Sequence, residues 1–454
     1  YFNYAGSIYS QNFPIIDIVM NTMLKQEESD QGRHFFRMFN GMGDDQRAAA
    51  YLNGKSFEQA VLDNTLSTEV FYEMMKLKGV YLRNYINSRL SSNEFKEFMA
   101  EFTKKYQFQE VNFTRLNSEF IRKFHFNLMD FIPNWYTINS TPRFIVKGVD
   151  ADQVEVGDYT KYIVKFQVYN PTNVEGVISV NVEEGGGMFP GGPRGRRGRA
   201  AQMESKPAKN YIIEPQKYKE IRILCDERPS NLTINTNISQ NLPSTIMQNF
   251  AKVTTTTTDT VTGIFDANAT LFTFNPKEIT VDNEDPGFRI IESNQKNKLQ
   301  SFFKKESEDK YKNLNFWMPP SKWTATIGAN YYGDYINSAV YKKSGSGSNK
   351  TEWTTQIQIP GFYEVFVYSS DLPMMGHRWG RNEEKKMQYY TVKHDDGEEE
   401  ISVETGRGRQ GWMTLGSFYF SQGEAKITLS DKGSGSNQII FADAVKWVYT
   451  NNNK

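Results

Sequence analysis

The 454-residue sequence contains one cysteine, Cys225, which excludes a disulfide framework and a cysteine metal cluster. Cys225 ends the apolar run Ile221–Cys225, so we expect a buried residue in a strand rather than a reactive thiol. No apolar run reaches the roughly 18 residues of a membrane span. Lys+Arg and Asp+Glu both number 53, and this zero net charge argues against nucleic acid as the main partner, because phosphate binding needs a basic surplus.

Histidine is almost as scarce, with four copies: His34, His125, His377 and His394. No His-Glu-x-x-His zinc helix and no Gly-x-Ser-x-Gly nucleophile elbow occurs. We expect His34 and His125 to be core or capping residues, and Asp-Gly after His394 predicts a hairpin turn. Carboxylates are abundant, so a glycosidase pair stays open although no pattern marks one. We therefore expect a non-catalytic chain with no metal site and no cofactor of its own.

The first third of the chain is predicted to be a helical bundle, residues 1–138. Apolar residues from Phe95 to Tyr106 recur at helical spacing, and Ser91 and Glu94 before them form a capping box. Two further stripes run over residues 70–86 and 116–128. The short polar connections between the stripes favour antiparallel neighbours.

Residues 139–240 change to period two and predict an Ig-like antiparallel β-sandwich. A Gly/Arg-rich loop at 185–200 interrupts it, which we interpret as a hairpin tip; RNA binding through this loop is the less favoured alternative. Residues 241–278 are polar, with a threonine run at 254–258, and are predicted to be a linker. The last segment, residues 279–454, holds many short strand signals and predicts a third domain.

Aromatic residues are plentiful in this last segment, which contains six of the seven tryptophans. Trp353 and Trp447 lie within strand patterns and are expected in the core. Trp379 lies on a loop beside Arg378 and Arg381, and is the first candidate for stacking on a sugar. The further candidates are Trp317 and Trp323, then Tyr331, Tyr332 and Tyr335. Stacking is worth about 1–3 kcal/mol per ring, by analogy with nucleic-acid bases. The alternative that these rings plug the open ends of a sandwich stays open.

The order of motifs in residues 279–449 resembles the C-terminal domain of golvesin and of xanthan lyase. The resemblance rests on Val281–Phe288, Gly361–Tyr368, Gly411–Phe420 and Ala442–Trp447. It implies a jelly-roll-like β-sandwich that binds carbohydrate, such as a cell-envelope glycan. The chain departs from the pattern by insertions at 296–314 and 374–382.

Residues 1–240 are similar to the tail of the catalytic domain and the β-domain of aminopeptidase N-type zinc peptidases. Asp130–Tyr136, leading into Thr141–Val146, carries this likeness. The whole layout resembles Bacteroidetes membrane proteins that join an ABC-type permease, a peptidase-like domain and a golvesin-like module. In such a protein the zinc helix would lie upstream of Tyr1. The first residue is not methionine, so we interpret the chain as a fragment.

Two hypotheses follow. The first is a non-catalytic binding or scaffold portion of a larger membrane-associated protein, located outside the cytoplasm in the periplasm or cell envelope. Its partners would be a glycan and a membrane-protein or peptidase segment of the same polypeptide. The second is the accessory half of a zinc aminopeptidase whose metal domain lies upstream.

Overall fold

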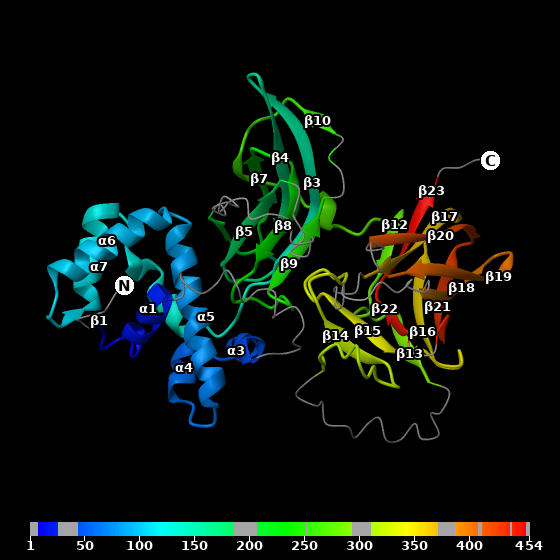
Figure 1. Ribbon diagram of the computed structural model, residues 1–454, viewed down its shortest axis with the longest axis horizontal. Coiled ribbons are helices and arrows are strands. Elements are labelled where there is room, and N and C mark those ends of the chain that lie inside the picture. The colour runs from blue at the N-terminus through cyan, green and yellow to red at the C-terminus, as the bar shows by residue number, and fades with distance from the viewer. Residues whose placement is uncertain are drawn as a thin grey trace, which may run out of the picture. The chain divides into compact units, whose positions relative to one another are not determined.

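The computed structural model describes residues 8–25, 44–185, 207–250, 253, 255–292, 310–370, 386–406, 411–435 and 438–450. These residues divide into two compact units, with the boundary between Leu271 and Phe272 (Figure 1). The elements are helices followed by mainly antiparallel sheets, which confirms the α+β class. Among the described helices, none combines the length and apolar character that a membrane span needs.

The first unit begins with helices that form where the sequence places apolar stripes. They are α1 (Ile16–Lys25), α3 (Asp44–Leu52), α4 (Phe57–Leu62), α5 (Thr68–Asn87), α6 (Ser92–Lys105), α7 (Phe113–Phe124) and α8 (Ile132–Thr137), with the 3-10 turn η2 (Leu128–Asp130) and the parallel pair β1 (Ile8–Tyr9) and β2 (Val111–Asn112). The Ser91 hydroxyl accepts the Glu94 N–H at 3.2 Å and the Glu94 carboxylate accepts the Ser91 N–H at 2.9 Å, which confirms the capping box. His125 caps α7 in a left-handed conformation, as predicted, whereas His34 lies outside the described residues.

The helices share their hydrophobic core with the β-sandwich that follows. Val177 and Ile238 of the sandwich are buried in the same cluster as the α5, α6 and α7 side chains. The Asn84 amide of α5 also donates to the Asn237 side chain at 2.7 Å in a buried position. The helical part and the sandwich therefore share a hydrophobic core within the first unit.

Two sheets pack around a second core in this unit. One has the order β10-β3-β4-β7-β11 and the other β6-β5-β8-β9. The strands are β3 (Ile145–Val156), β4 (Tyr159–Tyr169), β5 (Gly176–Glu184), β6 (Lys209–Ile213), β7 (Tyr218–Cys225), β8 (Pro229–Asn235), β9 (Thr245–Asn249), β10 (Thr256–Thr257) and β11 (Gly263–Asp266). Cys225 is fully buried in β7, as predicted. Nearly all of the Gly/Arg-rich loop lies outside the described residues.

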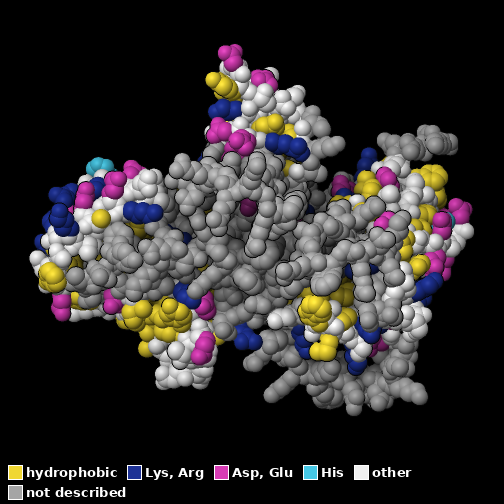
Figure 2. Space-filling model, viewed as in Figure 1, with side chains coloured by type: hydrophobic (Ala, Val, Ile, Leu, Met, Phe, Trp, Pro, Cys, Tyr) yellow, Lys and Arg dark blue, Asp and Glu magenta, His cyan; other side chains and the backbone are white. Residues whose placement is uncertain are grey.

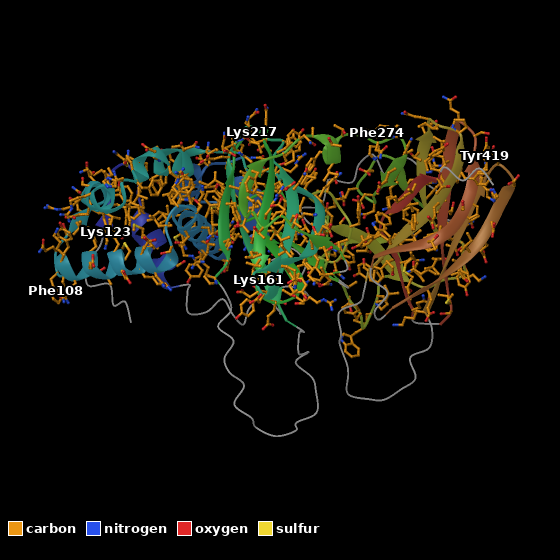
Figure 3. All side chains as sticks on the ribbon, turned by 90° about the horizontal axis from the view of Figure 1, so that it is seen from above. Phe108, Lys123, Lys161, Lys217, Phe274 and Tyr419 are labelled. Carbon is orange, nitrogen blue, oxygen red and sulfur yellow. The ribbon has the colours of Figure 1, made fainter. Side chains whose placement is uncertain are left out.

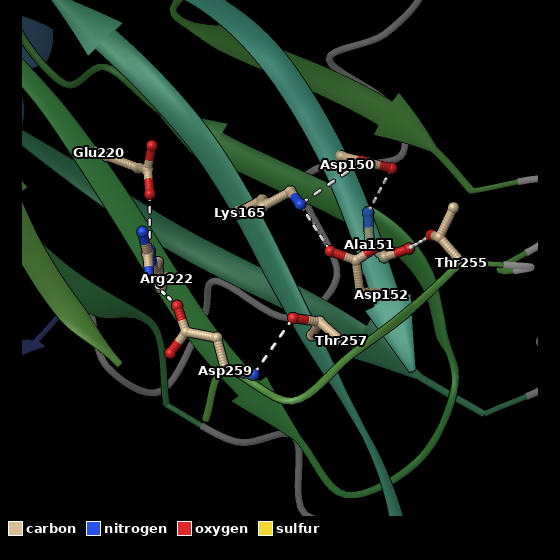
Figure 4. Close-up of polar contacts among 9 residues, drawn as sticks. All are labelled: Asp150, Ala151, Asp152, Lys165, Glu220, Arg222, Thr255, Thr257 and Asp259. Atoms are coloured by element: carbon tan, nitrogen blue, oxygen red, sulfur yellow. Dashed lines mark hydrogen bonds and ion pairs between the residues drawn. The ribbon is translucent and has the colours of Figure 1, made fainter. Parts of the chain in front are cut away.

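Residues 241–278, predicted to be a linker, supply edge strands to this sandwich. β9 pairs with β8, β10 with β3, and β11 with β7. Figure 4 shows the polar contacts that hold the threonine-rich segment: the Thr255 hydroxyl donates to the Ala151 carbonyl at 3.3 Å, and Arg222 pairs with Asp259. The composition is polar because these edge strands are largely exposed, so low hydrophobicity did not mean absence of structure.

The second unit is built from three sheets with the orders β12-β23-β17-β20, β13-β16-β21-β18-β19 and β14-β15-β22. The strands are β12 (Glu278–Val281), β13 (Phe288–Ile291), β14 (Thr324–Ile327), β15 (Ser338–Lys343), β16 (Lys350–Ile357), β17 (Gly361–Ser369), β18 (Lys386–His394), β19 (Gly397–Thr405), β20 (Gly411–Phe420), β21 (Gly423–Gly433), β22 (Ile439–Ala442) and β23 (Val445–Thr450). The first two sheets contribute to one core, in which Trp353 and Trp447 are buried as predicted. The hairpin after His394 is also confirmed.

Candidate functional site

One face of the β12-β23-β17-β20 sheet points away from the core and carries aromatic side chains. In β17 the side chains of Tyr363, Val365 and Val367 are buried, so the alternate residues face outward. These outward residues are Phe362, Glu364, Phe366 and Tyr368. Three of the four are aromatic, which is unusual for the exposed side of a sheet and makes this face the candidate site.

The strand register places further aromatic rings on the same face. Phe362 lies opposite Tyr419 of β20, and their ring centroids are 5.4 Å apart. Tyr419 is labelled in Figure 3, and about two fifths of each of these two side chains is exposed. Six residues further along β17, Tyr368 lies opposite Trp412, with ring centroids 5.3 Å apart. The aromatic side chains therefore extend along the strand for about 20 Å.

Tyr332, which precedes β15, completes a cluster at one end of this face. Its ring centroid lies 5.6 Å from that of Tyr368 and 5.1 Å from that of Trp412. We call Tyr332, Tyr368 and Trp412 the aromatic cluster. All three side chains are partly exposed, so a ligand can reach them without opening the core.

A charged pair lies across the same face. The Lys446 ammonium is 4.5 Å from the Trp412 ring centroid and 5.6 Å from that of Phe366, within the range of cation–π attraction. The same ammonium is 3.4 Å from the Glu278 carboxylate. Rings for stacking and charged groups for hydrogen bonding therefore occur side by side on one surface.

Two buried carboxyl groups lie behind the aromatic cluster. Asp443 is 3% exposed; its Oδ2 accepts hydrogen bonds from the Tyr332 N–H at 3.2 Å and the Ser370 hydroxyl at 3.1 Å. Its Oδ1 has no hydrogen-bond partner among the described residues. Burial, together with the neighbouring Asp282, raises the pKa of Asp443 far above its usual range. Burial also raises the pKa of Asp282, to about 8.

A small pocket is connected to Asp443 through Ser370, which lines the pocket and donates to the Asp443 carboxylate. Its lining includes Ser370, Gln388, Tyr390 and Phe441. The Tyr390 hydroxyl donates to the Gln388 side chain at 3.1 Å, and burial raises the pKa of Tyr390. In the part of the chain that the structure describes, no group of three or more His, Cys, Asp or Glu side chains is placed to hold a metal ion.

The residues singled out in the sequence have different positions. Trp379, Arg378 and Arg381 lie outside the described residues, so their role stays a prediction. The other candidates differ in exposure: Trp317 is 86% exposed, Trp323 is 8% exposed, Tyr331 is 5% exposed, and Tyr332 and Tyr335 are partly exposed.

Burial counts against sugar stacking by Trp323 and Tyr331, because neither ring offers a free face. Tyr332 joins the aromatic cluster. The outward aromatic residues of β17 and β20 were not among the candidates, although aromatic residues at alternate positions 362, 366 and 368 were the signal that could have found them.

The family model of the Golvesin C-terminal domain matches residues 312–449. This match confirms the resemblance over those residues, which contain most of the face just described. The comparisons give no support to the resemblance of residues 1–240 to aminopeptidase N-type peptidases. The search of curated proteins found no match for the chain.

Solved structures show distant likenesses. A Paenibacillus xanthan lyase is 14% identical, with 68% of this chain and 26% of the lyase covered and a TM-score of 0.27. The chain thus spans about a quarter of that enzyme. A family 35 carbohydrate-binding module from Clostridium thermocellum is 13% identical. The match covers 37% of this chain and 98% of the module, with a TM-score of 0.23. A Clostridium thermocellum xylanase fragment complexed with xylohexaose is 14% identical. The match covers 29% of this chain and 26% of the fragment, with a TM-score of 0.15. Scores this low do not establish a shared fold.

Proposed function

We propose that the second unit is a non-catalytic glycan-binding module, and that its binding surface is the outward face of the β12-β23-β17-β20 sheet. The observation that carries the proposal is the line of aromatic rings from Phe362 and Tyr419 to the aromatic cluster. Flat rings offer apolar surface to the C–H faces of sugars. Lys446 and Glu278 supply a donor and an acceptor for sugar hydroxyl groups.

The shape of this surface favours an extended ligand. Sheets present their side chains in straight rows, and a row of about 20 Å accommodates several sugar rings in line. A small metabolite would use one ring pair and leave the rest of the row unused. The match to the Golvesin C-terminal domain is consistent with this proposal, since the outward residues of β17 and β20, and Lys446 of β23, lie within it.

The wider role rests on the same proposal. We assign the module to a jelly-roll-like sandwich and the sandwich of the first unit to the Ig-like class. We place the chain in the periplasm or cell envelope, as the binding and scaffold portion of a larger membrane-associated protein that needs no cofactor of its own. The accessory half of a zinc aminopeptidase remains the alternative for the first unit, and the described residues offer no observation in its favour.

The experiment is a glycan array on the full chain, followed by affinity measurements on the strongest glycans. Xylohexaose and xanthan oligosaccharides are included as soluble probes. Trp412→Ala is expected to weaken binding by about 10-fold or more, since stacking contributes about 1–3 kcal/mol per ring. Tyr419→Ala tests the other end of the row, where the exposed ring can be removed with little effect on the core.

One control and one further variant make the result specific. Tyr159→Ala removes a 74% exposed ring from the first unit and is expected to leave glycan binding unchanged. Trp317→Ala tests whether that exposed tryptophan contributes to glycan binding. The proposal fails if no glycan binds, or if binding persists unchanged in both Trp412→Ala and Tyr419→Ala while thermal melting shows that the variants are folded.

A further inference from the structure

The segment 313–323, between β13 and β14, exposes two large apolar side chains that the proposed glycan surface does not use. Trp317 is 86% exposed and Met318 is 77% exposed. We call this segment the Trp317 loop. Exposing two adjacent large apolar side chains in water is unfavourable, so such a site marks an interaction surface.

Hydrogen bonds hold the Trp317 loop in this conformation. The Asn315 side chain accepts the N–H groups of Trp317 at 3.1 Å and of Met318 at 2.9 Å. The hydroxyl of the buried Tyr341 accepts the Asn315 N–H at 3.1 Å and donates to the Asn313 carbonyl at 2.9 Å. The loop backbone is therefore anchored on β15, which lowers the cost of ordering the loop at binding.

Three exposed lysines lie in or beside the loop: Lys322 within it, and Lys312 and Lys343 next to it. The backbone ties two of them to the loop region, since the Lys312 N–H donates to the Ala325 carbonyl and the Lys343 N–H to the Pro320 carbonyl, both at 2.8 Å. None of the three ammonium groups forms an ion pair within the described part of the chain. Figure 2 shows hydrophobic and basic side chains gathered over the β14–β15 region.

We propose that the Trp317 loop docks on an anionic lipid surface. Tryptophan is favoured at the boundary between head groups and acyl chains, where its ring meets apolar matter and its N–H meets water. Met318 would enter the same layer, and the three lysines would lie against lipid phosphates. An apolar protein partner would not need three uncompensated cations, and an uncharged glycan would not be attracted by them.

The proposal rests on residues other than those of the glycan surface, so the two can fail independently. The test uses the full chain and vesicles of phosphatidylcholine, with or without phosphatidylglycerol, in a co-sedimentation assay. Binding is expected only to vesicles that contain phosphatidylglycerol, and it should weaken as salt is added.

Substitutions separate the apolar and the electrostatic contributions. Lys312→Gln, Lys322→Gln and Lys343→Gln are each expected to weaken binding about fivefold, and the triple variant about a hundredfold. Trp317→Ser with Met318→Ser is expected to weaken binding about tenfold or more. Lys393→Gln, at an exposed lysine of β18, and Leu62→Ser, at a 76% exposed leucine of α4, are the matched controls.

Three outcomes overturn the proposal: absence of binding, equal binding to neutral and anionic vesicles, or binding that is unchanged in the Trp317/Met318 variant. Loss of glycan binding in that variant, with vesicle binding intact, would assign the loop to the glycan surface instead. Because the substituted side chains are exposed, thermal melting is expected to stay at the wild-type temperature, which excludes unfolding as a cause.

Discussion

Lys78 of α5 offers a stringent test of how burial controls stability in the first unit. Its side chain is 4% exposed, and its ammonium donates to the Trp135 carbonyl at 2.5 Å. Within the described part of the chain it has no carboxylate partner. Burial alone lowers the pKa of Lys78 to about 7.

The size of the effect follows from this pKa. A fall from 10.5 to about 7 corresponds to an unfavourable free energy on the order of 5 kcal/mol for the charged form in the folded state. The unfolded chain holds more protons than the folded chain between pH 7 and 10.5, so stability is lowest at and below pH 7 and rises through this window. Lys78→Met removes this penalty but leaves the Trp135 carbonyl without its donor, which costs about 1–3 kcal/mol. The variant is therefore expected to be about 2–4 kcal/mol more stable at pH 6 and less stable near pH 10.5.

Urea unfolding at several pH values between 6 and 10.5, followed by circular dichroism at 222 nm, measures this difference. The signal reports mainly on the first unit, because the α-helices that the structure describes all lie there. Lys104→Met, at an exposed lysine of α6, is the control. Its difference in unfolding free energy from the wild type is expected to keep the same sign at every pH. A stability difference for Lys78→Met that stays constant across the pH range would refute the reasoning.

Two further predictions concern the second unit. Its unfolding can be followed by tryptophan fluorescence. Burial raises the pKa of Asp282 from 3.8 to about 8, so the folded state binds this proton more tightly than the unfolded chain does. The resulting stabilisation of the fold is fully present below pH 3.8 and is lost as the pH rises to about 8. Asp282→Asn should flatten that slope by up to about 1.4 kcal/mol per pH unit, and an unchanged slope between pH 4 and 8 would contradict this. Lys342 pairs with the fully buried Asp431, so Lys342→Met should cost about 3–5 kcal/mol at pH 7. Adding Asp431→Asn should recover much of this loss; equal stability of the single variant and wild type in urea would contradict the prediction.

Periodicity in the sequence was sufficient for the elements whose two faces differ in polarity. The helix after Ser91 and the strands around Trp353 and Trp447 formed where they were predicted. The linker prediction differed from the structure because edge strands pair through backbone groups and need no apolar pattern. The apolar run at residues 439–447 forms two strands, β22 and β23, which pair in different sheets.

The candidate site was harder to predict for a related reason. In β17 both faces carry large apolar residues. The alternation of apolar and polar residues that usually distinguishes the core face from the exposed face is therefore missing. Phe362 and Tyr363 cannot be assigned to outside and inside until the partner strands are known. Burial of Trp323 likewise depends on contacts between distant segments, which local sequence does not encode.

The buried acid Asp443 connects the core of the second unit to its proposed binding surface. Its Oδ2 accepts the backbone N–H of Tyr332, and the Tyr332 ring packs against Tyr368 and Trp412. Burial and the neighbouring Asp282 raise the pKa of Asp443 well above its usual range, which favours the neutral carboxyl. Ionisation would place an uncompensated charge directly behind the aromatic cluster. We expect the segment that carries Tyr332 to move, because this lets water reach the charged carboxylate. We therefore expect glycan affinity to fall at alkaline pH in the wild type and to stay constant in Asp443→Asn, which keeps the acceptor for Tyr332 and cannot ionise. Parallel affinity profiles for the two proteins from pH 6 to 10 would show that Asp443 does not position the cluster.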